Sequence, residues 1–136
     1  MTKYGAKVKY VIIDTSSILF GFSYNRNVFE TAKEQFRGYK MLVSKGIINE
    51  LTRLSANKGS KGLRARIALL ELKSKRIDVD NISIHPDRWI VDTAIKNNSS
   101  VVITNDTALA AKLLRAKLKV YKISKSGILK NFDNIQ

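Results

Sequence analysis

The stretch VVITNDTALAAKL, residues 101–113, decides the fold. Its first four residues are β-branched and form a short apolar run, which is typical of a strand buried on both faces. Asn105 and Asp106 follow directly, and residues 107–117 then have the spacing of an amphipathic helix. The stretch therefore predicts a strand, an acid at the carboxyl end of that strand, and a helix packed back along a sheet.

The same alternation of strand and helix recurs along the chain. Strands are predicted over 8–14, 39–44, 100–105 and 119–124, and helices over 27–36, 46–56, 63–75, 86–98 and 107–117. Residues 57–62 are predicted to be a flexible loop, 76–84 a loop or weak strand, and 125–136 receive no assignment. This order predicts an α/β fold: one domain over residues 1–136, with three α/β/α layers around a central parallel sheet.

Charge is the strongest feature of the composition. The 136 residues include 25 Lys and Arg against 11 Asp and Glu, a net charge of +14. Such a domain usually binds a polyanion, with RNA or DNA expected before an anionic membrane surface. The chain has no apolar run of membrane-spanning length, a polar N-terminus unlike a secretory signal, and no cysteine for disulfides or thiolate metal sites. We expect a cytoplasmic protein with no membrane partner.

Four acids occupy the positions where this architecture places a ligand site. Asp14 and Asp106 end two predicted strands, Glu50 lies in the helix after the second strand, and Asp87 lies in the first turn of the helix that Pro86 opens. Ligands of open parallel sheets bind beyond the carboxyl ends of the strands. Clustered carboxylates repel one another unless a cation neutralises them, and oxygen ligands suit Mg²⁺ or Mn²⁺.

Each acid also has a purely structural explanation. Asp14 and Asp106 are suited to cap the helices that follow them. Asp87 is favoured by the dipole of its helix. Glu50 is spaced to pair with Arg53 across one turn.

The segments VIIDTSSIL, IINELTRL, DRWIVDTAI and VVITNDTAL resemble, in this order, the motifs of PIN domains, over about residues 9–124. The resemblance implies a small α/β nuclease that holds Mg²⁺ or Mn²⁺ with Asp14, Glu50, Asp87 and Asp106, which are thus both catalytic and metal-binding acids. The third motif, DRWIVDTAI, departs from the pattern that is usual in the family, so Asp92 is an alternative candidate to Asp87 for the third acid. The two acids lie about 140° apart on a helix, so they do not easily serve one site, and we prefer Asp87.

The resemblance implies a metal-dependent endoribonuclease, a hydrolase that cleaves RNA phosphodiester bonds with an activated water. We expect Ser16 and Thr104 to orient carboxylates or waters behind the metal ligands. The chain has one histidine, His85, which excludes a mechanism with two histidines. The basic cluster, defined as Lys58, Lys61, Arg64 and Arg66, is the predicted RNA-binding surface, with salt-dependent affinity.

Several roles remain open at this point. The ending TNDTALAAKLLRAKLKVYKIS, residues 104–124, resembles PIN proteins related to the ribosomal-RNA processing nuclease of the small-subunit processome, which implies a role in rRNA processing. A VapC-type toxin, held by an antitoxin in a toxin–antitoxin pair, has the same chemistry, and PIN proteins often form homodimers. A PIN-like module that binds RNA without cleaving it is the alternative outside enzymes. A phosphoacceptor receiver domain ranks low, because DTSS provides only one acid at the first strand end.

Overall fold

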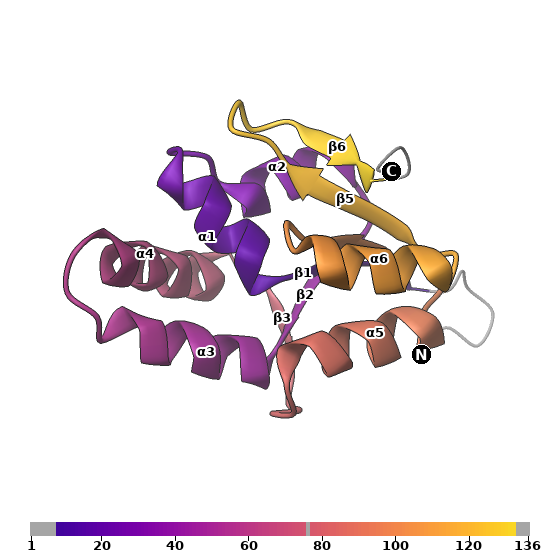
Figure 1. Ribbon diagram of the computed structural model, residues 1–136, viewed down its shortest axis with the longest axis horizontal. Coiled ribbons are helices and arrows are strands. Elements are labelled where there is room, and N and C mark those ends of the chain that lie inside the picture. The colour runs from indigo at the N-terminus through magenta and orange to yellow at the C-terminus, as the bar shows by residue number, and fades with distance from the viewer. Residues whose placement is uncertain (1–7, 76, 133–136) are drawn as a thin grey trace.

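A computed structural model describes residues 8–75 and 77–132 as six helices and a six-stranded sheet (Figure 1). The strands are β1 (Tyr10–Ile13), β2 (Lys40–Ser44), β3 (Asp78–Asp80), β4 (Val101–Ile103), β5 (Lys119–Ile123) and β6 (Leu129–Asn131). The helices are α1 (Thr15–Ser23), α2 (Val28–Gln35), α3 (Lys45–Ser55), α4 (Ser60–Ser74), α5 (Pro86–Lys96) and α6 (Thr107–Arg115). No helix of this part of the chain is long and apolar enough to cross a membrane.

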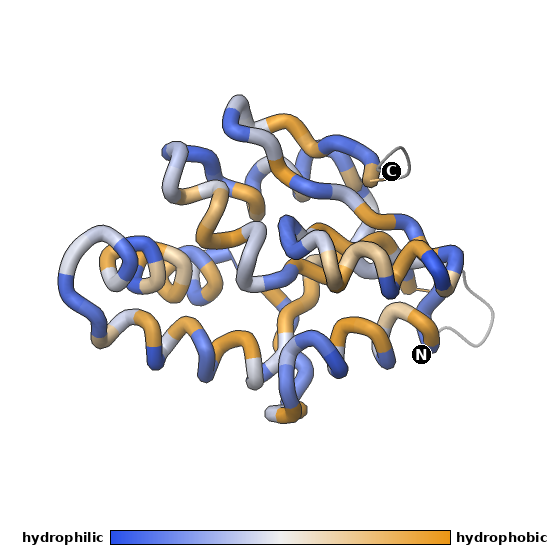
Figure 2. The backbone as a smooth tube through the Cα atoms, in the orientation of Figure 1, coloured by the Kyte–Doolittle hydropathy of each residue, from blue (hydrophilic) through white to orange (hydrophobic). Residues whose placement is uncertain are grey.

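The sheet has the order β3-β2-β1-β4-β5-β6, and its first five strands are parallel. At its centre, Val11, Ile12 and Ile13 of β1 are fully buried, as expected for a strand covered on both faces. Hydrophobic residues concentrate in these central strands, whereas hydrophilic and hydrophobic turns alternate along α3 and α5 (Figure 2). The predicted α/β fold with a central parallel sheet is therefore confirmed.

The connections place helices on both faces of the sheet. The chain moves outward from β1 to β2 and β3, crosses back to β4, and continues to β5. Because such crossovers are right-handed, the two directions put their helices on opposite faces. Accordingly, α1 packs on α2 and α4, and α5 packs on α6.

Some elements differ from the sequence expectation. Helix α1 was not delimited, and the tail provides β6, which pairs antiparallel with β5. The segment 57–62 is not a loop throughout, because α4 already begins at Ser60. A Cβ atom at Gly62 would lie 1.8 Å from the carbonyl oxygen of Asn57, so glycine allows α4 to begin this close to the end of α3.

The parallel strands bring the ends of β1 and β4 side by side. Val11, Ile12 and Ile13 pair with Val101, Val102 and Ile103, and the amide of Asp14 donates to the carbonyl of Ile103 at 2.9 Å. From β1 the chain continues toward β2 and β3 at one edge of the sheet, whereas from β4 it continues toward β5 and β6 at the other edge. The pair β1 and β4 is therefore the topological switch point, where open α/β sheets bind ligands.

Candidate active site

Asp14 is the buried acid at this switch point. It occupies the N-cap position of α1, but its side chain makes no capping hydrogen bond, so the structural explanation offered for it is wrong. Its carboxylate Oδ2 instead accepts from the Ser16 hydroxyl at 2.6 Å and from the Thr104 hydroxyl at 2.7 Å. The other carboxylate oxygen, Oδ1, accepts no hydrogen bond from the described residues. Because no fully buried side-chain oxygen of these residues lacks a hydrogen-bond partner, Oδ1 must be accessible to solvent.

The two hydroxyls connect β1 to the segment after β4. The Ser16 oxygen accepts from the backbone amide of Asn105 at 3.0 Å, and the Thr104 oxygen accepts from that of Asp106 at 3.1 Å. Ser16 Oγ and Thr104 Oγ1 also lie 3.2 Å apart. Since each hydroxyl has one proton and directs it to Asp14, this last contact adds no further donor. The carboxylate is thus held by one hydroxyl from α1 and one from the segment after β4, and backbone amides of that segment fix both hydroxyls.

Burial raises the pKa of Asp14, the hydrogen bonds from Ser16 and Thr104 lower it, and the charges of Asp87 and Glu50 raise it again. The net pKa lies above the ordinary value for an aspartate. The ionised form of Asp14 is therefore disfavoured in the protein alone. Asp87 and Glu50 lie within electrostatic reach of this carboxylate, and a cation there would reverse the effect.

Glu50 is half-buried on α3, and its position depends on a hydroxyl from α1. The buried Thr15 donates through Oγ1 to Glu50 Oε1 at 2.7 Å. Glu50 forms no ion pair with Arg53, so its structural explanation is also wrong. This contact was not predicted, because the hydroxyl-rich DTSS segment was its only signal in the sequence.

Asp87 and Asp92 lie in different environments on α5. Asp87 is in the first turn, half-buried, and its amide donates to Nδ1 of His85 at 3.2 Å. It lines a groove of about 440 Å³ together with Arg88 and Lys112. Asp92 lines the same groove, but its side chain is 54% exposed, lies 3.8 Å from Arg88, and is not among the charges that raise the pKa of Asp14.

Asp106 does cap a helix. Its Oδ1 accepts from the amide of Leu109 at 3.1 Å at the start of α6, as its structural explanation requires. Asp106 is not among the charges that raise the pKa of Asp14, although Thr104 contacts both residues. The side chain is half-buried, so the cap does not remove it from solvent.

The described residues contain no group of three Asp, Glu or His side chains placed to hold a metal ion directly between them. The chemistry of the donors nevertheless fits a hard divalent ion, because Asp14 offers a solvent-facing oxygen beside two further carboxylates. Mg²⁺ retains several of its waters, so the more distant acids would act through water.

Asn105 joins three elements beside these acids. Its Oδ1 accepts from the Ser17 hydroxyl at 2.7 Å and from the Ile123 amide at 3.1 Å, and its Nδ2 donates to the Ile123 carbonyl at 2.9 Å. The side chain thus links α1 and β5 to the segment after β4. From the sequence, Asn105 was considered only as an alternative cap for the helix after it, because its partners Ser17 and Ile123 are distant in sequence.

The basic cluster lies at the turn between α3 and α4, at the far left of Figure 1. Lys58 and Lys61 are exposed. Arg66 is partly engaged within the protein, because its Nη1 donates to the carbonyl of Ser55 at 2.7 Å, at the end of α3. Helix α3 starts at the carboxyl end of β2 and extends about 16 Å, which places this turn well away from the sheet edge.

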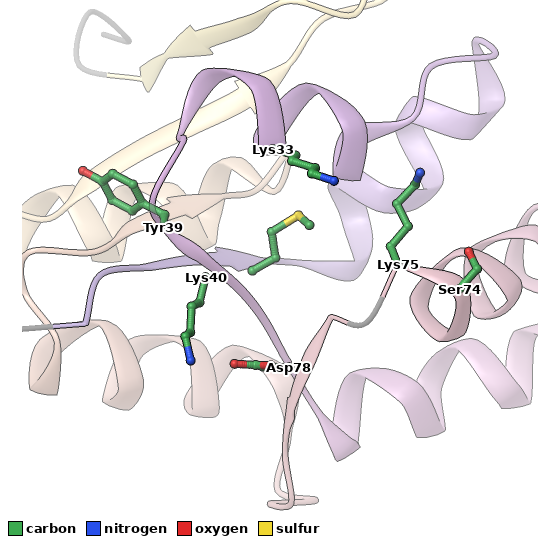
Figure 3. Close-up of a pocket in the computed structure, with 7 residues that line it drawn as sticks. Lys33, Tyr39, Lys40, Ser74, Lys75 and Asp78 are labelled. Carbon is green, nitrogen blue, oxygen red and sulfur yellow. The ribbon is translucent and has the colours of Figure 1, made fainter. Parts of the chain in front are cut away.

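A further hollow, of about 510 Å³, lies at the amino ends of β2 and β3. Figure 3 shows Lys33, Tyr39, Lys40, Lys75 and Asp78 around it. None of the four proposed acids lines it, and it opens at the opposite edge of the sheet from Asp14.

Comparison with known proteins gives consistent results. The sequence profile described as "PIN like domain" matches residues 11–125. Ribonuclease VapC4 of Methanocaldococcus jannaschii is 25% identical over 129 residues, covering 92% of this chain and 98% of that protein. The solved structure of the PIN domain endonuclease Utp24 superimposes with a TM-score of 0.73 at 23% identity, covering 90% of each chain, which shows the same fold.

Proposed function

The chain belongs to the family of PIN-like domains, and we propose on that premise that it is a metal-dependent endoribonuclease. The observation that carries this proposal is the state of Asp14: a buried carboxylate with a raised pKa and one solvent-facing oxygen, beside two further acids. A fold-stabilising aspartate would have used its oxygens to cap α1. The name of the VapC4 relative supports RNA as the substrate.

We propose Asp14, Glu50, Asp87 and Asp106 as the acids that hold Mg²⁺ or Mn²⁺. Asp14 would bind through Oδ1, since Oδ2 already accepts two hydrogen bonds. The ion would supply an activated water and stabilise the charge that develops on the phosphodiester. Ser16 and Thr104 would fix the orientation of Asp14, as the groups behind a metal ligand do elsewhere.

The remaining acids have separate tasks in this proposal. Thr15 holds Glu50 in one orientation, and the start of α6 holds Asp106. The net charge of +14 favours approach of RNA to a locally acidic site. We propose that the whole chain forms one domain, in which these acids meet at the carboxyl edge of a single sheet.

The test is cleavage of structured and unstructured RNA by the purified protein with Mn²⁺, Mg²⁺ or EDTA. Asp14→Asn is the informative variant, because an asparagine oxygen in place of Oδ2 keeps both hydrogen bonds. Cleavage that needs the ion and is lost in Asp14→Asn is expected. Cleavage in EDTA, or unchanged cleavage by the variant, would refute the mechanism, and RNA binding without cleavage in any metal would indicate a binding module.

Two cellular roles follow from the same chemistry. We propose rRNA processing first, from the motif resemblance described above. A VapC-type toxin is the second candidate, because VapC4 aligns with 92% of this chain. The partner of such a toxin would be an antitoxin. A homodimer would be compatible with either of the two roles. Growth arrest on expression, relieved by Asp14→Asn, would favour the toxin, whereas accumulation of unprocessed rRNA on depletion would favour processing.

A further inference from the structure

A groove of about 610 Å³ lies between α1 and the hairpin of β5 and β6. We refer to it as the hairpin groove, and the lining residues used below are Phe20, Asn105, Thr107, Lys122, Lys125 and Lys130. Figure 1 shows the hairpin in yellow at the top of the molecule, beyond α6 and beside α1. It is separate from the basic cluster at the turn of α3 and α4.

The hairpin groove is strongly cationic. No carboxylate of the part of the chain that the structure describes forms an ion pair with Lys122, Lys125 or Lys130. Three lysines at one groove without an ion-pair partner among the described residues repel one another, and that repulsion is relieved when an anion binds. The groove thus has the charge needed for a phosphate chain.

Aromatic rings lie among these lysines. The ammonium of Lys125 lies 5.4 Å from the centre of the Tyr24 ring, and Tyr24 packs against Phe20 with ring centres 5.0 Å apart. Tyr24 does not line the groove itself, but the residue is 42% exposed and lies beside the groove lysine Lys125. Lysines beside aromatic surfaces are the combination by which proteins bind unpaired nucleotides, through phosphate contacts and base stacking.

The hairpin groove also leads to the proposed site. Asn105 and Thr107 line the groove, and Asp106 stands between them in the chain. A strand lying along the hairpin groove would therefore contact the residues on either side of Asp106, although Asp106 itself does not line the groove. The basic cluster lies instead at the far end of α3, about 16 Å from the strand end at which that helix begins.

We propose that the hairpin groove binds the single-stranded part of an RNA substrate next to the point of cleavage. The proposal rests on the proposed endoribonuclease function. It names single-stranded RNA because a stacking surface serves bases that are free of pairing, whereas duplex RNA is recognised mainly by its shape. The predicted basic cluster then has at most a distant role in guiding RNA.

The test measures binding of a short fluorescent single-stranded RNA to the full chain in EDTA, where cleavage does not occur. The variant Lys125→Gln, Lys130→Gln removes two groove lysines. The matched control Lys33→Gln, Lys40→Gln removes the same charge from the hollow at the opposite sheet edge (Figure 3). Anisotropy titrations over a range of salt concentrations, repeated with the duplex of the same sequence, give the affinities.

Each lysine–phosphate contact with a single strand contributes about 0.7 to the slope of log K against log salt, so the groove variant should lose about 1.4 from that slope. If the groove variant and wild type bind equally at about 1 M salt, the variant should bind about 25-fold more weakly than wild type at about 0.1 M. The control should bind within about threefold of wild type, since neither Lys33 nor Lys40 lines the groove.

Equal effects of the two variants, or stronger binding of duplex than of single strand, would overturn the proposal. A failure of the proposed nuclease function can be distinguished from a failure of the groove proposal. If wild type cleaves no RNA in any metal while the groove variant still loses binding selectively, the groove stands and the catalytic proposal falls.

Discussion

Replacing Asp14 by asparagine should make the metal-free protein more stable while abolishing its response to metal. Asp14 is 5% exposed, and burial together with the charges of Asp87 and Glu50 raises its pKa. Asparagine is neutral and can keep the hydrogen bonds from Ser16 and Thr104 through one oxygen, while its amide nitrogen takes the solvent-facing position. The variant therefore loses the cost of a buried charge and little else.

The sign of the pH dependence follows from the raised pKa. Between the unfolded and folded pKa values of Asp14, the folded state binds more protons, so the free energy of unfolding of wild type falls as pH rises through that interval. Above it, wild type should be less stable than Asp14→Asn. As pH falls from the folded to the unfolded pKa, the stabilities of the two proteins should converge, because below the unfolded pKa Asp14 is neutral in both states.

Metal should reverse this order. An ion present at about 100 times its dissociation constant stabilises the folded state by about 2.7 kcal/mol. For 136 residues the entropy of unfolding is about 0.29 kcal/mol/K, so the Tm of wild type should rise by about 9 °C. Asp14→Asn should show little of that rise.

The assay is thermal unfolding by circular dichroism at several pH values, with EDTA or Mn²⁺. Asp92→Asn is the matched control, because it removes an exposed carboxylate from α5 and should respond to Mn²⁺ like wild type. If Asp14→Asn were less stable than wild type in EDTA at neutral pH, or gained as much from Mn²⁺, our account of Asp14 would be wrong.

Three further substitutions examine the other acids. Thr15→Val removes the hydroxyl that holds Glu50 at 2.7 Å, and we expect the half-saturating Mn²⁺ concentration for cleavage to rise about tenfold, with Thr15→Ser restoring it; an equal defect in both variants would argue for a packing role. Asp87→Asn should lower the cleavage rate at least about tenfold while Asp92→Asn stays within about twofold, and the opposite order would identify Asp92 as the third acid. Asp106→Asn should lose cleavage yet keep its Tm within about 2 °C of wild type, because asparagine caps a helix as well as aspartate does; a matching loss of stability would assign Asp106 to the fold alone.

The elements predicted correctly from sequence are those with strong local signals. β4 and α6 follow from a β-branched run and a clear apolar stripe, and α5 begins at Pro86 as expected. Helix α1, TSSILFGFS, was not delimited because its apolar residues are nearly continuous and show no stripe. β3 and β6 have three residues each and are defined by pairing with neighbours rather than by their own pattern.

The candidate site was predictable as a set of acids but not as an arrangement. Strand-end positions identified Asp14 and Asp106 from sequence. Whether each caps its helix depends on tertiary partners. Thr104, 90 positions away, supplies one of the two hydroxyls that engage Asp14, whereas the Asp106 carboxylate accepts from Leu109 of its own helix. The hairpin groove has no local signal either, since Phe20, Asn105 and Lys130 meet only in the folded chain.

The linkage of Asn105 to both α1 and β5 has a consequence for where an RNA would be cut. Asn105 comes immediately before Asp106 in the chain, and its side chain bonds directly to α1 and β5, which form the walls of the hairpin groove. A strand seated along the hairpin would be held at a constant offset from the acid. If the hairpin groove binds RNA as proposed, the ends of the fragments should therefore fall a fixed number of nucleotides from the first bound base.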